Sequence, residues 1–217
     1  EGWRVLTCSR QPFDPRCPWP GGEENHIVID LADPNKTIAA IETIKAKVDG
    51  RIHALVNNAG ISPKGPGGER LNTLDTDLRT WGHVFHVNFF SSVILARGLK
   101  DELTAARGSI VNVTSIAGSR VHPFAGAAYA TSKAALAALT REMAHDFGPL
   151  GVRVNAIAPG EVETAILSPG TDKIVEKLPM QRLGQPKEVA DVIWFLCSDQ
   201  SSYISGAEIE VNGAQHV

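Results

Sequence analysis

The fold is decided by the stretch Ser109-Ile110-Val111-Asn112-Val113-Thr114-Ser115. Its first five residues form a short, largely apolar run, which predicts a buried strand. A strand that is buried on both faces is typical of a parallel sheet covered by helices on both sides. The stretch therefore predicts an α/β fold in which Ser115 lies at the carboxyl end of a strand.

Strands and helices alternate outward from this stretch over the whole chain. Further strands are expected at residues 5–8, 27–29, 54–56, 151–157 and 207–211. Helices are expected at residues 34–49, 78–106, 131–147 and 186–198. The alternation predicts one domain, residues 1–217, with a doubly wound parallel sheet of the Rossmann-like kind in a three-layer α/β/α arrangement.

The composition excludes several classes of protein. A chain of 217 residues is long enough for one domain with a large buried core. Its net charge of -3 is too balanced to indicate a nucleic-acid partner. No apolar run approaches the roughly 20 residues that span a bilayer, and no signal peptide is evident, so we expect a cytoplasmic protein without a membrane partner. The three cysteines are few and widely spaced, which argues against disulfides and against a metal site.

Tyr129-Ala130-Thr131-Ser132-Lys133 is the segment whose chemistry is most specific. A tyrosine and a lysine four residues apart lie on one face of a helix. A free phenol has a pKa of about 10, and a neighbouring ammonium group lowers that pKa. Tyr129 could then donate a proton to a carbonyl or accept one from an alcohol. Taken alone, the pair is explained at least as well by an ordinary helix surface.

Two further polar residues have both a chemical and a structural interpretation. Ser115 could hydrogen bond a substrate carbonyl and stabilise developing negative charge, or it could simply cap a loop. Asn88 lies in an apolar helical segment, where its amide needs a partner. That amide could hold a water connected to Lys133, or it could satisfy a loop backbone.

The order and spacing of these motifs resemble the classical short-chain dehydrogenase/reductase family along the whole chain. The matching elements are Asn57-Asn58-Ala59-Gly60, Asn88, Ser115, Tyr129-x-x-x-Lys133, Pro159-Gly160-x-Val162-x-Thr164 and Ser205-Gly206…Val211-Asn212-Gly213. The resemblance implies an oxidoreductase that transfers a hydride between a nicotinamide dinucleotide and a small-molecule carbonyl or secondary alcohol.

The resemblance also implies a role for each matching residue. Tyr129 corresponds to the general acid/base, Ser115 to the hydroxyl that orients the carbonyl, and Asn88 to the proton relay. Lys133 corresponds to the residue that lowers the tyrosine pKa and binds the nicotinamide ribose. Asp30 corresponds to the acid that hydrogen bonds the adenine amino group. The remaining implied cofactor contacts are Asn57, Ala59, Gly60, Tyr129, Pro159, Gly160, Val162 and Thr164.

Ser9 and Arg10 bear on the choice of cofactor. Ser9 stands at the end of a strand, where members of the family that prefer NAD carry an acidic residue. The missing carboxylate removes repulsion of a 2'-phosphate, and Arg10 supplies a bidentate partner for it. We therefore expect NADP rather than NAD as the cofactor; a solvated arginine at the start of a loop is the alternative.

One departure from the family pattern concerns the N-terminus. Family members begin with a strand and a Thr-Gly-x-x-x-Gly-x-Gly loop that leads into the first helix, and none of these is present in residues 1–217. Loss of that strand would expose the edges of its neighbours, so we expect a further segment before Glu1. The alternative function is a non-catalytic nicotinamide-binding or assembly subunit, which the missing segment favours and the complete Asn88, Ser115, Tyr129 and Lys133 set opposes.

The substrate and the oligomeric state remain open. A 3-oxoacyl thioester and a sugar or polyol both fit, and His122, Phe124 and the loop of residues 161–179 are expected to form the pocket walls. The helix at residues 131–147 carries small or apolar side chains nearly all round, which indicates burial on more than one side. The strand and tail at residues 209–217 need a cover as well. We therefore expect a homotetramer or homodimer.

Overall fold

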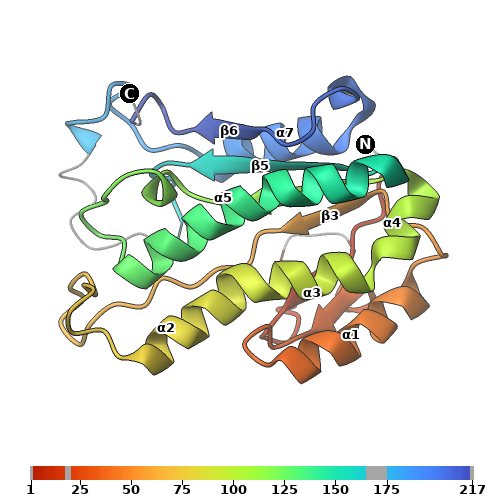
Figure 1. The fold of residues 1–217 in the computed structure, drawn as a ribbon, viewed down its shortest axis with the longest axis horizontal. Coiled ribbons are helices and arrows are strands. Elements are labelled where there is room, and N and C mark those ends of the chain that lie inside the picture. Colours follow the sequence, from red (N-terminus) through yellow and green to blue (C-terminus); the bar gives the residue numbers. More distant parts are fainter. Residues whose placement is uncertain (1, 18–20, 165–174, 216–217) are drawn as a thin grey trace.

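The structure is a computed structural model that describes residues 2–17, 21–164 and 175–215. Strands and helices alternate along it as the sequence predicts (Figure 1). The strands are β1 (Thr7–Ser9), β2 (His26–Val28), β3 (Ala54–Asn57), β4 (Ser109–Val113), β5 (Arg153–Pro159) and β6 (Glu208–Val211). The helices are α1 (Pro34–Lys47), α2 (Leu78–Phe85), α3 (Ser91–Gly98), α4 (Lys100–Ala106), α5 (Ala127–Phe147) and α7 (Pro186–Cys197).

The central sheet is parallel and has the order β3-β4-β5-β6. The register pairs Asn57 with Asn112 and Val113 with Ile157, so the carboxyl ends of β3, β4 and β5 meet at one edge. In Figure 1, α5 crosses the sheet on the near side while α7 lies behind it. This arrangement confirms the predicted three-layer α/β/α fold and places loops from different strands side by side.

The strands near the N-terminus differ from the single sheet that the sequence predicts. β1 and β2 pair with each other in parallel as a separate two-stranded sheet. Within the described ranges no strand hydrogen bonds the outer edge of β3, and Val56 on β3 is 39% exposed. Val28 on β2 is 58% exposed. Apolar strand residues that would be covered in a continuous sheet therefore face outward here.

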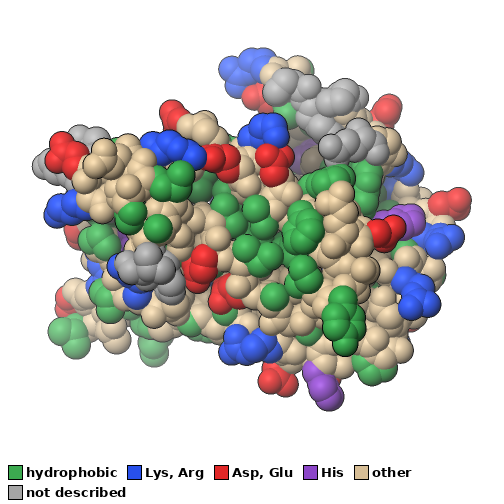
Figure 2. Space-filling model, turned by 90° about the horizontal axis from the view of Figure 1, so that it is seen from above, with side chains coloured by type: hydrophobic (Ala, Val, Ile, Leu, Met, Phe, Trp, Pro, Cys, Tyr) green, Lys and Arg blue, Asp and Glu red, His purple; other side chains and the backbone are tan. Residues whose placement is uncertain are grey.

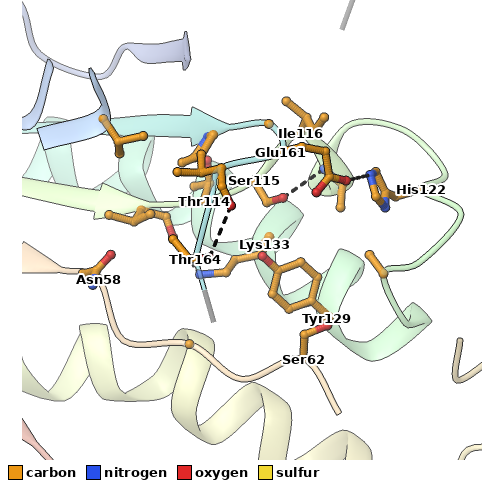
Figure 3. Close-up of a pocket in the computed structure, with 18 of the residues that line it drawn as sticks. Asn58, Ser62, Thr114, Ser115, Ile116, His122, Tyr129, Lys133, Glu161 and Thr164 are labelled. Atoms are coloured by element: carbon orange, nitrogen blue, oxygen red, sulfur yellow. Dashed lines mark hydrogen bonds and ion pairs between the residues drawn. The ribbon is translucent and has the colours of Figure 1, made fainter. Parts of the chain in front are cut away.

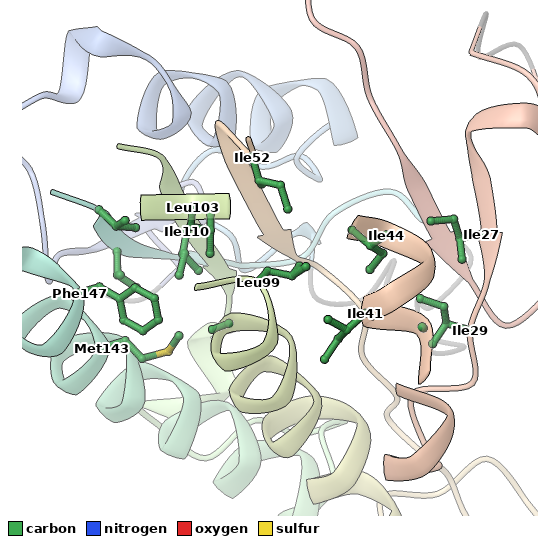
Figure 4. Packing of buried hydrophobic residues seen from close by; sticks show 14 residues of the cluster. Ile27, Ile29, Ile41, Ile44, Ile52, Leu99, Leu103, Ile110, Met143 and Phe147 are labelled. Atoms are coloured by element: carbon green, nitrogen blue, oxygen red, sulfur yellow. The ribbon is translucent and has the colours of Figure 1, made fainter. Parts of the chain in front are cut away.

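The main core lies between the central sheet and the helices on the near side. Ile41 and Ile44 of α1 pack toward β2, and Leu99, Leu103 and Ile110 pack between the helices and β4 (Figure 4). Every residue of β4 is buried, as its apolar run predicts. A second cluster, which includes Val111, Ile157 and Leu196, lies between the sheet and α7. Burial on both faces fixes β4, and hence the loop that follows it.

The single helix predicted at residues 78–106 is wrong in detail. α2 passes into a π-helical turn at His86–Phe90, then into α3, and a break at Leu99 separates α3 from α4. A π-helical turn accommodates one extra residue and changes the direction of the side chains on it. This turn carries Asn88, which is 1% exposed.

The start of α1 follows from local capping, and the start of α5 differs from the prediction. α1 begins after Asp33, whose carboxylate accepts hydrogen bonds from the backbone of Asn35 and Lys36, with Pro34 in the first turn. α5 begins at Ala127, four residues before the predicted start, so Tyr129 and Lys133 both lie within the helix.

Apolar side chains are exposed at several places on the surface. Figure 2 shows them gathered on the face seen from above, where α7 and β6 lie in Figure 1. In the described part of the chain, no helix combines the length and the apolar character needed to cross a membrane.

Candidate active site

A pocket of about 580 Å³ opens at the carboxyl ends of β3, β4 and β5. Ser115, Tyr129 and Lys133 all line it (Figure 3). Ser115 comes from the loop after β4, and the other two come from the first turns of α5. The parallel sheet therefore brings together three of the four predicted catalytic residues, at the edge where ligands bind in folds of this kind.

Ser115 begins a short turn that packs directly on α5. Its hydroxyl accepts a hydrogen bond of 3.2 Å from the backbone N–H of Ala117, so part of its role is the capping role considered above. The turn ends at Gly118, where a Cβ atom would lie 2.8 Å from the backbone nitrogen of Ala134 and 3.0 Å from the carbonyl carbon of Lys133. Only glycine allows this approach, which sets Ser115 beside the helix that carries Tyr129.

Gly118→Ala is therefore expected to destabilise the protein by about 1–3 kcal/mol, the usual cost of overpacking. It is also expected to lower turnover, because the turn with Ser115 must move away from α5. Denaturant unfolding and steady-state kinetics check both effects. Gly82→Ala is the matched control: Gly82 lies within α2 with open space around it, so alanine is expected to stabilise by about 0.5–1 kcal/mol. Equal effects of the two substitutions would show that the contact with α5 does not matter.

Lys133 is a buried cation at the inner end of the pocket. Its side chain is 3% exposed, and its Nζ donates a hydrogen bond of 2.7 Å to the backbone oxygen of Val113. Burial lowers the pKa of Lys133 to about 8. A Cβ atom at Gly60 would lie 3.2 Å from Nζ, so the absent side chain leaves the ammonium group open toward the pocket.

The pKa of Tyr129 shifts in the opposite direction from the one the sequence predicts. Burial raises that pKa above its usual value, and the negative charge of Glu161 raises it further, while hydrogen bonding to Ser115 lowers it. The Nζ of Lys133 lies 5.8 Å from the centroid of the Tyr129 ring. With its pKa raised, the phenol is protonated near neutral pH and is suited to donate a proton.

Asn88 uses its amide to hold the loop after β3. Its Oδ1 accepts a hydrogen bond of 2.8 Å from the backbone N–H of Ile61. Its Nδ2 donates to the backbone oxygen of Ile61 and to Ser132 Oγ, both at 3.0 Å. This is the loop-backbone role considered as the alternative for Asn88, and it fixes Gly60 next to Lys133.

The residues predicted to contact the nicotinamide end of a cofactor divide into two groups. Gly60, Pro159, Gly160, Val162 and Thr164 line the pocket, and Ala59 is exposed beside them. Asn57 instead points into the protein, where its amide donates a 2.8 Å hydrogen bond to Asn112, which in turn donates to Thr140 of α5.

Arg10 and Asp30 lie elsewhere. Both line a second hollow beside β2 and α1, together with Lys36 and Lys47. Asp30 accepts a hydrogen bond of 3.1 Å from the backbone N–H of Ala32. The structure thus brings these two predicted cofactor residues to one place, separate from the pocket that holds Tyr129.

The predicted wall residues His122 and Phe124 line the pocket, as does Glu161 at the start of the predicted wall loop, whereas Lys64 and Ser62 were not predicted. Glu161 forms a contact of 2.8 Å with His122. The sequence predicted Glu161 as part of the wall loop but not its contact with His122. Asn58 lies in the Asn57–Gly60 motif, which could have indicated it as a lining residue. Lys64 and Ser62 lie in no motif that predicts a place in the pocket. Residues 165–174 of the expected wall lie outside the described residues.

Most of the chain is similar to known proteins. A family model described as enoyl-(acyl carrier protein) reductase matches residues 19–216. Protein FixR of Bradyrhizobium diazoefficiens is 58% identical over 219 residues, which is 100% of this chain and 79% of that protein. A cyclopentanol dehydrogenase of Comamonas sp. is 34% identical over 200 residues, 89% of this chain and 77% of that protein. A similar crystal structure is that of an oxidoreductase of the short chain dehydrogenase/reductase family from Brucella ovis, in complex with a partially ordered NAD. Its sequence is 58% identical, the TM-score is 0.84, and the match covers 97% of this chain and 89% of that one.

Proposed function

This chain belongs to the short-chain dehydrogenase/reductase family, and on that basis we propose that it transfers a hydride between a nicotinamide dinucleotide and the carbon of a carbonyl or secondary alcohol. The observation that carries the proposal is the convergence of Ser115, Tyr129 and Lys133 on one pocket at the carboxyl ends of the strands. A hydroxyl, a buried phenol and a buried ammonium group together suit proton transfer at a substrate oxygen.

Tyr129 is proposed as the group that moves the proton. In the direction of reduction, its O–H bond breaks and the proton passes to the substrate oxygen as the carbonyl carbon receives a hydride. In the direction of oxidation, the phenolate takes the proton of the alcohol as the carbinol C–H bond breaks. Ser115 holds the substrate oxygen by a hydrogen bond, and Lys133 provides a positive charge that stabilises the phenolate. Asn88 contributes by holding the loop with Gly60 in place.

The pocket fits the nicotinamide end of the cofactor. The ammonium group of Lys133 donates one hydrogen bond to Val113, so its other N–H groups can donate to a ligand. Gly60 has no side chain that would cover them. Pro159, Gly160, Val162 and Thr164 would hold the ring and its carboxamide. When bound, the cofactor supplies the hydride donor or acceptor that no side chain of the protein provides.

The finer proposal is that the cofactor is NADP(H) and that Arg10 reads its 2'-phosphate. Arg10 is exposed, and it lines the second hollow with Lys36, Lys47 and Asp30. Three cationic side chains against one carboxylate favour an anion there. The related Brucella ovis structure contains NAD, so the preference needs a direct test in this protein.

Arg10→Ala is expected to weaken NADPH binding by about 1.5–3 kcal/mol, the worth of a charged hydrogen bond, and to leave NADH binding almost unchanged. Fluorescence titration with each cofactor measures the two affinities. Arg16→Ala is the control, because Arg16 lies in the same loop but pairs with Asp14. Losses of equal size for NADPH and NADH would reject the assignment of Arg10.

A homodimer or homotetramer is part of the same proposal. The half-buried and exposed positions of α5 include small residues such as Ala135 and Ala138. Phe90, on the neighbouring π-helical turn, is 46% exposed. A helix surface of small residues beside an exposed aromatic ring favours close packing against a second copy of the chain.

The assay for the proposed function offers the purified protein either NADP⁺ or NAD⁺ with a panel of secondary alcohols, and either reduced cofactor with the matching ketones. The panel includes cyclopentanol, the alcohol named for one relative. Formation or loss of the reduced nicotinamide is followed by its absorbance. We expect turnover of at least one pair. A complete absence of turnover with both cofactors in both directions would reject the proposal.

A further inference from the structure

Glu161, His122 and Lys64 line the same pocket as Tyr129 but have no part in the chemistry described above. The Nε2 of His122 lies 2.8 Å from Oε1 of Glu161, and the two side chains are only 11% and 12% exposed. Figure 3 shows this pair at the side of the pocket opposite Asn58, with Ser115 and Tyr129 between them. A nearly buried carboxylate is costly unless its oxygens have hydrogen-bond partners.

Two contacts orient the imidazole ring of His122. The backbone N–H of Phe124 donates to Nδ1 of His122 at 3.3 Å, so Nδ1 acts as an acceptor and the ring proton lies on Nε2. Nε2–H then donates to Oε1 of Glu161. The histidine therefore holds one carboxylate oxygen of Glu161 in place. Among the described residues, none donates a hydrogen bond to the other oxygen, Oε2.

The backbone around Glu161 is also fixed. The N–H of Glu161 donates to Oε1 of Gln215 at 3.2 Å, and its carbonyl accepts from the N–H of Gly184 at 2.9 Å. A Cβ atom at Gly160 would lie 2.7 Å from the same Gln215 oxygen, so only glycine allows the chain to pass there. The carboxylate therefore enters the pocket from a well-held segment.

The charges that line the pocket restrict what Oε2 can bind. Burial lowers the pKa of Lys64, and the charge of Glu161 opposes that shift. Burial raises the pKa of Tyr129, and the charge of Glu161 adds to that shift. An anionic group on the substrate would be repelled by Glu161. A cationic group would meet two lysines, Lys64 and Lys133, in the same pocket. A neutral hydroxyl can donate to the carboxylate without either penalty.

We propose that Glu161, positioned by His122, is a specificity determinant that accepts a hydrogen bond from a second hydroxyl on the carbon next to the reacting one. The preferred substrates are then vicinal diols and the corresponding α-hydroxyketones, rather than simple alcohols or acyl thioesters. This inference rests on the proposed hydride transfer at Tyr129. A substrate that lacks the second hydroxyl excludes water from Oε2 without replacing its hydrogen bond. The buried acceptor is then unpaired, so the transition state for that substrate is less well stabilised.

The test compares kcat/KM for cyclopentanol with kcat/KM for cis- and trans-1,2-cyclopentanediol. The wild-type protein is expected to favour one diol by about 10-fold or more, the effect of one hydrogen bond to a charged group. Glu161→Gln is expected to lose about 10-fold or more on that diol and less than about 3-fold on cyclopentanol. It is also expected to shift the pH profile of oxidation to lower pH, because the charge that raises the pKa of Tyr129 is gone.

Two further variants keep the test decisive. Glu163→Gln is the matched control, because Glu163 is exposed, bonds Gln185 and does not line the pocket. His122→Phe keeps the carboxylate but removes its support, and it is expected to lose a smaller factor on the diol alone; it carries the test should Glu161→Gln fail to fold.

The outcomes separate this inference from the proposed function. The role of Glu161 would be overturned if the wild-type protein turned over cyclopentanol and preferred neither diol. It would also be overturned if Glu161→Gln lost equal activity on the alcohol and the diol. In both cases the proposed function would stand. A wild-type protein that turns over no alcohol or ketone at all would overturn both.

Discussion

Replacement of Tyr129 by phenylalanine is expected to reduce turnover by about 10²-fold or more while the fold and cofactor binding are retained. The substitution removes one oxygen from a side chain that lines the pocket beside Ser115. The ring can keep its position in α5, so the loss reports the proton that the hydroxyl carries. Steady-state kinetics measure the loss, and thermal unfolding with cofactor titration verifies that the rest of the protein is unchanged.

Tyr203→Phe is the matched control for this experiment. Tyr203 is the other tyrosine of the chain, and its side chain is fully exposed. Its substitution is expected to leave turnover at the wild-type level. If Tyr129→Phe kept more than about a tenth of the wild-type kcat, Tyr129 could not be the general acid/base, since that role contributes at least about 10²-fold.

Replacement of Lys133 by methionine is expected to suppress turnover as strongly, and at the same time to stabilise the protein at neutral pH. The pKa of Lys133 is about 8 in the folded protein and near 10.5 when the lysine is free. Between these two pH values the unfolded chain binds more protons at Lys133 than the folded protein does. The free energy of unfolding therefore rises with pH across this window, and the gain is lost as pH falls toward 8. At pH 7 the wild-type protein carries the full cost of burying the charge.

The expected gain in stability at pH 7 is about 2 kcal/mol, after the lost hydrogen bond to Val113 offsets part of the relief from burying the charge. The gain should shrink as the pH approaches 10.5, where the lysine is neutral in both states. Urea unfolding of both proteins from pH 7 to pH 10 measures the difference. Lys100→Met, on the exposed surface of α4, should change neither turnover nor this pH dependence. A difference in stability that does not change with pH would contradict the low pKa of Lys133.

The parts of the fold that depend on local patterns could be predicted from the sequence. β4 is buried at all five positions, as its short and largely apolar run predicts, and Ser115 lies two residues after that run ends. The spacing of Tyr129 and Lys133 places both on α5, and the shared edge of the parallel strands brings them to Ser115. These predictions needed only the period of the pattern and the rule that parallel strands share a carboxyl edge.

Features that depend on contacts between distant segments could not be predicted. The π-helical turn around Asn88 has the same apolar pattern as an ordinary helix and differs from it in its backbone hydrogen bonds, which the pattern does not reveal. The contact of Asn88 with Ile61 joins segments 27 residues apart. The pair of His122 and Glu161 joins residues from two loops that have no common motif. The raised pKa of Tyr129 likewise depends on burial and on Glu161, whereas the spacing to Lys133 predicts a lowered value.

The separation of β1 and β2 from the central sheet has a related cause. The apolar residues predict strands at 5–8 and 27–29, whereas β1 is Thr7–Ser9 and β2 is His26–Val28. Which strands pair is decided by hydrogen bonds along their edges. Arg10 and Asp30 follow β1 and β2, so their position relative to the pocket depends on the same pairing.

Direct transfer of hydrogen is the measurement that tests the central claim most directly. Cyclopentanol, or one of the cyclopentanediols, is labelled with deuterium at the carbinol carbon and incubated with the protein and oxidised cofactor, and the reduced cofactor is analysed by mass spectrometry and NMR. Hydride transfer in the pocket predicts that one deuterium per turnover appears on a single face of the nicotinamide ring and that none is exchanged with water. A protein that binds the cofactor but leaves it unreduced, or a label that is found in the solvent, would contradict the account.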